Sequence, residues 1–203
     1  MVNIKHIQQE VDGINWKCGQ ACLEMIFDFY NIEYDKNDIW ENIKALRDTW
    51  SGQYFAFTYT LAKYAIEHGL NATMYRAKEE TWSEVLKQID NLSVPAILEM
   101  REPKSGQSHF VVYTGIKNRM YYYSDPNSEK DFGYFKSVDV KELWHPQPEI
   151  NVAGYFFVVF DMKVDEMISC VRCGKPVPVV HNSLKPLIEG IACPHCGSAA
   201  YLT

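Results

Sequence analysis

Four cysteines near the C-terminus constrain the fold of this chain more than any other feature of its sequence. They form two Cys-x-x-Cys pairs, Cys170 with Cys173 and Cys193 with Cys196, separated by 19 residues. Four thiolates in two such pairs complete the tetrahedral shell that structural Zn²⁺ prefers. A segment of about 35 residues buries too little apolar surface to fold unaided, so we expect a small zinc ribbon stabilised by its metal.

The same cysteines have two alternative interpretations, a pair of disulfides or a redox-active Cys-x-x-Cys. All six cysteines of the chain fall into two groups, which is unlike the disulfide framework of a secreted protein. We therefore expect a reducing compartment and a cytoplasmic protein. His181 and His195 lie near the quartet, but four thiolates leave no need for either as a ligand. The ribbon serves either to bind a protein partner or to cap the fold.

The composition excludes several classes of protein. The 203 residues are 47% hydrophobic and 23% charged, as in an ordinary globular chain with a core. The net charge of −6 argues against nucleic acid as a partner. No apolar run approaches the ~20 residues of a membrane span, and the N-terminus has no signal-peptide core, so we expect no membrane partner.

Helical periodicity dominates the first half of the chain. Apolar residues recur at helical spacing in four segments, and the third is expected to turn Phe57 inward. The first predicted helix covers 18–30, and the second begins near Asn37, which is its expected N-cap. The third covers 54–68, and the fourth lies around 82–89.

Strand patterns dominate the second half. The predicted strands are 72–76, 95–100, 108–116, 120–124, 132–138 and 154–162. Short polar connections between most of them favour antiparallel hairpins. The order of elements predicts an α+β fold with N-terminal helices packed on an antiparallel sheet. We place the domain boundary in the charged stretch 161–166, which gives domains 1–165 and 166–203.

Cys18 has the sequence environment of a reactive thiol. It lies where the first amphipathic helix begins, so the positive end of the helix dipole and the adjacent Lys17 favour its thiolate. Gly19 leaves room for a substrate backbone. Cys22, one turn later on the apolar face, is expected to be a buried structural thiol. The alternative for Cys18 is an ordinary packed cysteine.

His109 and Asp125 lie at one end of a predicted hairpin. Their midpoint is residue 117, close to the expected turn, which predicts that they are cross-strand neighbours on one face. A carboxylate beside an imidazole holds the ring while its other nitrogen faces a thiol. The alternative is a hydrogen-bonded core histidine and an Asp-Pro turn.

These motifs together resemble one family. Cys-Gly-x-Ala-Cys-Leu-x-Met-Ile from Cys18, His-Phe-Val-Val-x-x-Gly from His109 and Asp125-Pro126 resemble the bacteriocin-processing (double-glycine leader) peptidases of the papain superfamily, over roughly residues 5–162. The resemblance implies a papain-like cysteine peptidase fold and a peptide or protein substrate. It also implies that Cys18 is the nucleophile, His109 the general base and acid, and Asp125 the residue that orients His109.

The resemblance also implies a glutamine whose amide helps to form the oxyanion hole, about six or seven residues before the cysteine. Here the nearest upstream glutamines, Gln9 and Gln8, lie nine and ten residues before Cys18, and 12–16 looks like a short insertion. Gln9 or Gln8 is therefore the expected donor, with Asn15 as a substitute.

The sequence thus favours a cysteine peptidase that cleaves a peptide or isopeptide bond through a Cys-His-Asp triad and a thioester. One alternative is a non-catalytic papain-like adaptor that docks a partner through the ribbon. Another is a deamidase or transamidase that uses the same triad. We expect most aromatic residues, including Tyr54 and Phe55, to pack in the core, and Glu99 and Glu102 to lie at a solvated edge rather than against a substrate amine.

Overall fold

The computed structural model describes residues 1–12, 15–46, 52–129, 133–147 and 154–202. In this part of the chain, an eight-stranded sheet has the order β14-β13-β5-β10-β6-β7-β8-β9, and all neighbouring strands are antiparallel. Its strands are β5 (Asn71–Ala77), β6 (Ala96–Arg101), β7 (Ser108–Lys117), β8 (Met120–Ser124), β9 (Gly133–Phe135), β10 (Phe156–Asp161), β13 (Ile188–Ala192) and β14 (Ala199–Leu202).

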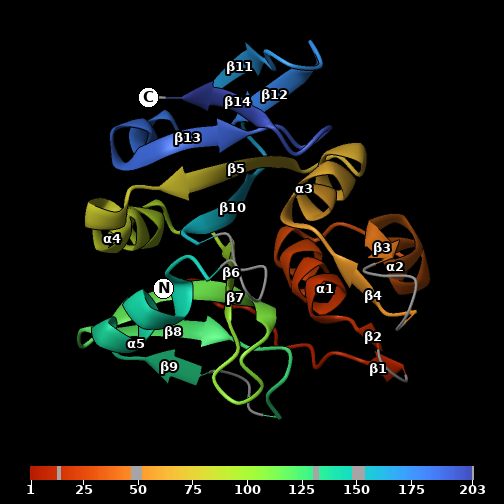
Figure 1. Cartoon of the computed structure of the whole chain (residues 1–203), viewed down its shortest axis with the longest axis vertical. Helices are drawn as coiled ribbons and strands as arrows, with labels where there is room; N and C mark the ends of the chain where they lie inside the picture. Colours follow the sequence, from red (N-terminus) through yellow and green to blue (C-terminus); the bar gives the residue numbers. More distant parts are fainter. Residues whose placement is uncertain (13–14, 47–51, 130–132, 148–153, 203) are drawn as a thin grey trace.

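Helices cover both faces of this sheet (Figure 1). They are α1 (Cys18–Tyr30), α2 (Lys36–Ile43) and α3 (Thr58–Glu67) on one side, and α4 (Trp82–Leu92) and α5 (Ser137–Trp144) on the other, with two 3-10 turns, η1 (Glu79–Thr81) and η3 (Asn182–Leu187). Successive side chains of a strand point to opposite faces of the sheet, so each strand contributes to two hydrophobic cores. Ile97 packs in the core under α1–α3, and its neighbour Leu98 packs in the core under α4 and α5. This arrangement confirms the α+β class.

Three small antiparallel pairs complete the fold. They are β1 (Val11–Asp12) with β2 (Asn15–Trp16), β3 (Lys44–Leu46) with β4 (Tyr54–Ala56), and β11 (Glu166–Ser169) with β12 (Pro176–Val179). Among the described residues, no helix combines the length and apolar composition needed to cross a membrane.

The first half of the chain differs from the sequence prediction in two places. The helix expected from residue 54 begins at Thr58, because Tyr54–Ala56 pair with β3 as a strand. Phe57 precedes that helix and is 41% exposed instead of inward. The N-cap of α2 is Asp35 rather than Asn37, because the Asp35 carboxylate accepts the backbone N–H of Asn37 at 2.8 Å.

The strand predicted over 132–138 is also different. Residue 132 lies outside the described residues, β9 ends at Phe135 and α5 begins at Ser137. The carboxylate of Asp139 accepts the backbone N–H of Lys136 at 3.1 Å, which satisfies a free donor at the start of α5. This capping contact favours a helix over a longer strand.

The C-terminal segment extends the main sheet. β13 pairs with β5, and the Thr73 hydroxyl of β5 donates to the carbonyl of Pro178 at 2.7 Å. Cys170 and Leu184 are buried in the same core as Tyr75. The division into domains 1–165 and 166–203 stays a prediction. The predicted ribbon segment continues the main sheet, because its strand β13 pairs with β5.

Candidate active site

Cys18 is the first residue of α1 and its side chain is 9% exposed. No side chain caps this end of the helix, so the first backbone N–H groups and the positive end of the dipole lie beside the thiol. Lys17, expected to strengthen this field, instead pairs with Glu10 at 3.4 Å and lies over the Trp40 ring. Cys22 is fully buried, as predicted for a structural thiol.

Gly19 has a packing role that the sequence analysis did not predict. A Cβ at this position would lie 3.1 Å from the Cβ of Ala56 in β4 and 3.2 Å from the Cδ2 of Leu61 in α3. The missing side chain therefore lets β4 and α3 approach the start of α1. The expectation that Gly19 also leaves room for a substrate backbone stays a prediction.

His109 and Asp125 form a hydrogen bond, with His109 Nε2 2.6 Å from Asp125 Oδ1. They are not directly opposite, because the pairing of Val112 with Ser124 puts Asp125 level with Val111, two residues from His109. A bulge at Thr114 shifts the register by one residue and so keeps both side chains on one face of the hairpin. Gly115, with φ of 139°, adopts the backbone that this bulge requires. The two residues still lie at the same end of the hairpin and close together.

The loop that carries Asp125 is fixed by further hydrogen bonds. The backbone N–H of Asn127 donates to Asp125 Oδ1 at 2.8 Å. His6 lies between Ser124 and Ser128, with Nδ1 2.8 Å from the Ser124 hydroxyl and Nε2 2.9 Å from the Ser128 carbonyl. These contacts orient the carboxylate toward the His109 ring.

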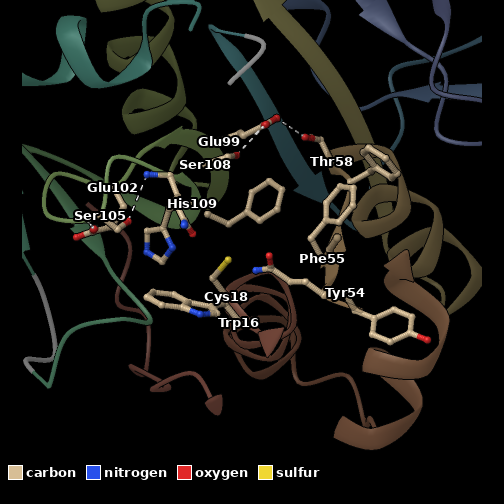
Figure 2. Close-up of a pocket in the computed structure, with 15 residues that line it drawn as sticks. Trp16, Cys18, Tyr54, Phe55, Thr58, Glu99, Glu102, Ser105, Ser108 and His109 are labelled. Atoms are coloured by element: carbon tan, nitrogen blue, oxygen red, sulfur yellow. Dashed lines mark hydrogen bonds between the residues drawn. The ribbon is translucent and has the colours of Figure 1, made fainter. Parts of the chain in front are cut away.

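The thiol and the imidazole form the second half of the arrangement. Figure 2 shows the Cys18 sulfur directed toward the His109 ring. Since Nε2 of His109 is bonded to Asp125, Nδ1 is the ring nitrogen that faces the sulfur. Cys18, His109 and Asp125 are thus brought together in the order expected from the sequence.

The electrostatics favour a thiolate–imidazolium pair. Burial opposes ionisation of Cys18, but the hydrogen bond and charge of His109, with smaller contributions from the N–H groups of Phe110 and Gly19, lower its pKa. Burial also opposes a charged His109, yet Asp125 and Cys18 raise the pKa of its ring to about 10. The pKa of Asp125 is lowered, because the bond from His109 outweighs burial. Burial raises the pKa of Cys22 well above its usual range.

A cavity of about 500 Å³ opens beside Cys18 and His109. Figure 2 shows it bounded by Trp16 below, by Tyr54 and Phe55 on one side, and by Glu99 above. Its lining residues are Trp16, Cys18, Gln53–Thr58, Glu99, Glu102, Ser105 and Gln107–Phe110. This space is large enough to take a substrate segment against the sulfur.

The two glutamines expected as oxyanion donors lie outside this lining. Gln8 is exposed. Gln9 is 8% exposed, and its amide Nε2 donates to Asn127 Oδ1 at 3.3 Å, beside the Asp125 loop. The glutamines that line the cavity are Gln53 and Gln107.

Most of the cavity wall was not expected from the sequence. The segment from Tyr54 was expected to be helical, and as β4 it instead brings Tyr54 and Phe55 to the site, with Gln53 just before them. Glu99 was assigned to a solvated edge, but it lines the cavity. Strand alternation carried a usable signal, because Glu99 is opposite Phe110 and shares a face with Ile97.

The cysteine quartet forms a second candidate site. The Cys170 and Cys196 sulfurs are 3.8 Å apart, those of Cys173 and Cys193 are 3.7 Å apart, and all four lie within 4.8 Å of one another. Four thiolates about 2.3 Å from a tetrahedral ion are separated by about 3.8 Å. The four cysteines can therefore hold a metal ion. His195, outside this group, lies with Nε2 3.1 Å from the Pro176 carbonyl.

The fold and the thiol–imidazole pair define a cysteine peptidase of papain-like architecture. The chain belongs to the Peptidase_C39 like family, whose profile matches residues 1–147. The resemblance identified from the sequence motifs is thereby confirmed. A sequence search of curated proteins finds no match.

Solved structures share this fold at low sequence identity. A double glycine motif protease from an AMS/PCAT transporter, in complex with the leader peptide, has 18% identity and a TM-score of 0.53 over 78% of this chain and 91% of its own. The peptidase domain of Streptococcus ComA has 16% identity and a TM-score of 0.56 over 78% and 98%. A candidate C39-like peptidase from Bacillus anthracis has 16% identity and a TM-score of 0.59 over 78% and 94%.

Proposed function

We propose that this chain hydrolyses a peptide or isopeptide bond, with Cys18 as the nucleophile, His109 as the general base and acid, and Asp125 as the residue that orients His109. One observation carries the proposal: three distant parts of the chain converge so that a thiol at a helix N-terminus faces an imidazole that is hydrogen-bonded to a carboxylate. That arrangement activates a thiol at neutral pH.

In the first half of the reaction, the Cys18 sulfur attacks the carbonyl carbon, and the carbonyl π electrons move to oxygen. The tetrahedral intermediate collapses when the C–N bond breaks, and imidazolium His109 gives its proton to the leaving amine. The product is a thioester on Cys18 and a free amine. In the second half, neutral His109 takes a proton from water, the hydroxide displaces the thiolate, and the carboxylic product leaves.

The developing oxyanion needs hydrogen-bond donors. The backbone N–H of Cys18, in the first turn of α1, is one candidate. The family resemblance assigns a glutamine side chain as the second, and Gln9 suits this role better than Gln8 because Gln9 is buried beside the Asp125 loop.

We further propose that the quartet binds one structural Zn²⁺ and that the substrate is a peptide or protein. The sulfur separations support the metal, because they match a tetrahedral tetrathiolate shell. The cavity beside Cys18, and a fold relative crystallised with a leader peptide, support a peptide substrate. We also propose that the ribbon segment docks a protein partner.

Site-mapped alkylation with iodoacetamide tests the nucleophile. Peptide mass mapping of the native, reduced protein should find Cys18 modified faster than Cys22, which is fully buried. Cys18→Ala should lose both this modification and peptide hydrolysis, whereas Cys22→Ala, the matched control in the same helix, should keep both. A native Cys18 that stays unmodified would overturn the proposal and favour the adaptor interpretation.

A further inference from the structure

Glu99 is a carboxylate in the cavity of the reactive thiol that the catalytic roles leave unused. It lies in β6 opposite Phe110 of β7, and it lines the same cavity as Cys18 and His109. Figure 2 shows Glu99 at the far end of the cavity from the Cys18 sulfur, with Thr58 and Ser108 bonded to it. Its position fits a contact with a substrate side chain rather than with the reacting bond.

Two hydrogen bonds fix the Glu99 carboxylate, and it can still accept further hydrogen bonds. The Thr58 hydroxyl donates to Oε2 at 2.7 Å, and the Ser108 hydroxyl donates to Oε1 at 3.2 Å. A carboxylate has about four acceptor sites, so each oxygen keeps one for a further donor. Burial raises the pKa of Glu99, and these two hydroxyls only partly offset that effect. A cationic partner would therefore stabilise the charged carboxylate.

The described cavity offers Glu99 no free cation. Its lining residues include neither lysine nor arginine, and the imidazolium of His109 is paired with Asp125. Arg101, two residues along β6, is paired with Glu142 at 2.6 Å. Lys44, which lies over the Tyr54 ring, is paired with Glu41. A basic ligand can therefore supply a positive charge that the described lining does not give Glu99.

Glu102, the other carboxylate of the lining, has a different role. Its Oε2 accepts the backbone N–H groups of Lys104 and Ser105, and it closes the turn between β6 and β7. Backbone donors thus satisfy Glu102 within its own loop, and its pKa is lowered by them despite burial. Glu99 is the carboxylate of this cavity that remains available to a ligand.

The aromatic walls suit a long side chain with a charged end. Trp16, Tyr54, Phe55, Phe57 and Phe110 line the space around Cys18 and Glu99. Apolar rings pack against the methylene groups of lysine or arginine, and their faces attract the cationic group. A small or acidic side chain would gain neither contact.

We propose that this cavity selects substrates with a lysine or arginine beside the scissile bond, and that Glu99 binds the cationic group. This inference rests on the proposed peptidase function and names its substrate class. Glu99 is a specificity residue in this account, since it contacts the substrate side chain and not the reacting atoms.

Dipeptidyl acyloxymethyl ketones test the inference, because they alkylate an active-site thiol and carry a chosen side chain. Three matched probes would carry lysine, norleucine or glutamate at the first or second position from the warhead, and the rate of Cys18 modification would be followed by peptide mapping. Lysine and norleucine differ only in the terminal amine. A hydrogen bond to a charged group is worth about tenfold or more in rate, so the expected order is lysine, norleucine, glutamate.

In Glu99→Gln, the ratio of lysine to norleucine rates should fall from about tenfold to within about threefold. In Glu67→Gln, a matched change at an exposed carboxylate outside the cavity, the ratio should stay as in the wild type. Equal rates for all three probes on wild-type Cys18 would overturn the basic specificity and leave the peptidase proposal standing. A Cys18 that no probe modifies would overturn both. Because the order among the wild-type rates needs no variant, the inference can fail even if Glu99→Gln does not fold.

Discussion

His109 and Asp125 are joined by a hydrogen bond of 2.6 Å although the strand register does not place them opposite each other. The bulge at Thr114 moves β7 relative to β8, and Asp125 reaches the ring from the loop just after β8. His6 and the N–H of Asn127 hold that loop. The catalytic geometry therefore depends on contacts beyond the hairpin itself.

This dependence predicts the effect of Asp125→Asn. The amide cannot stabilise imidazolium His109 as a carboxylate does, so we expect kcat to fall by about 10²-fold or more, in the range of general acid–base contributions. The pKa of His109 should fall with it, because Asp125 is the first of the groups that raise it. The pH–rate profile of a peptide substrate measures both effects. An unchanged profile would show that Asp125 does not orient the ring.

Gln9→Ala tests the second oxyanion donor. Loss of one such donor lowers kcat by about 10²–10³-fold. Iodoacetamide modification of Cys18 needs no oxyanion, so its rate should change little. Gln8→Ala is the matched control, because Gln8 is exposed and adjacent. If both variants keep full kcat, the donor is another group, and Gln53 is the next to test because it lines the cavity.

Gly19→Ala should destabilise the protein by about 1–3 kcal/mol through overpacking. The new Cβ would lie 3.1 Å from Ala56 Cβ and 3.2 Å from Leu61 Cδ2. Urea unfolding gives the free energy. Ala56→Gly removes one of the two crowded atoms, so the double variant should lose less stability than the two single variants predict together. Additive losses would mean that the Gly19–Ala56 contact is not the cause.

The quartet leads to a prediction about metal removal. Freshly purified, reduced protein should contain about one Zn²⁺ per chain, and chelation should lower Tm by more than about 10 °C, since structural zinc contributes about 10–16 kcal/mol in small peptides and each kcal/mol moves Tm by about 2–4 °C. Added Zn²⁺ should restore Tm. Elemental analysis and thermal unfolding measure these quantities. A metal content far below one per chain would contradict the zinc assignment.

The parts of the fold that the sequence predicted are those set by local patterns. Helical spacing of apolar residues identified α1 and α4, and alternation identified β6, β7 and β8 to within a residue or two at each end. Cys18 and His109 lie at the ends of such elements, so their positions followed from the same patterns. The Asp-Pro pair after β8 marked Asp125, the third residue of the proposed triad.

The parts that the sequence did not predict depend on contacts between distant segments. Residues 54–56 have a sequence compatible with a helix, and their pairing with β3 makes them a strand beside Cys18. The local sequence does not distinguish Glu99 from other strand glutamates, because the hydroxyl that fixes it at the cavity belongs to Thr58, 41 residues away. The pairing of β13 with β5 likewise has no local signature.

The central claim is that His109 holds Cys18 as a thiolate, and the pH dependence of Cys18 alkylation tests it most directly. Alkylation follows the thiolate, so its rate should reach half its maximum below the usual cysteine pKa of about 8.5, because the pKa of Cys18 is lowered by His109. In His109→Ala, the imidazole no longer offsets the effect of burial on the pKa of Cys18, so the midpoint of the alkylation rate should move to higher pH. A wild-type midpoint at or above about 8.5, or the same midpoint in both proteins, would contradict the account.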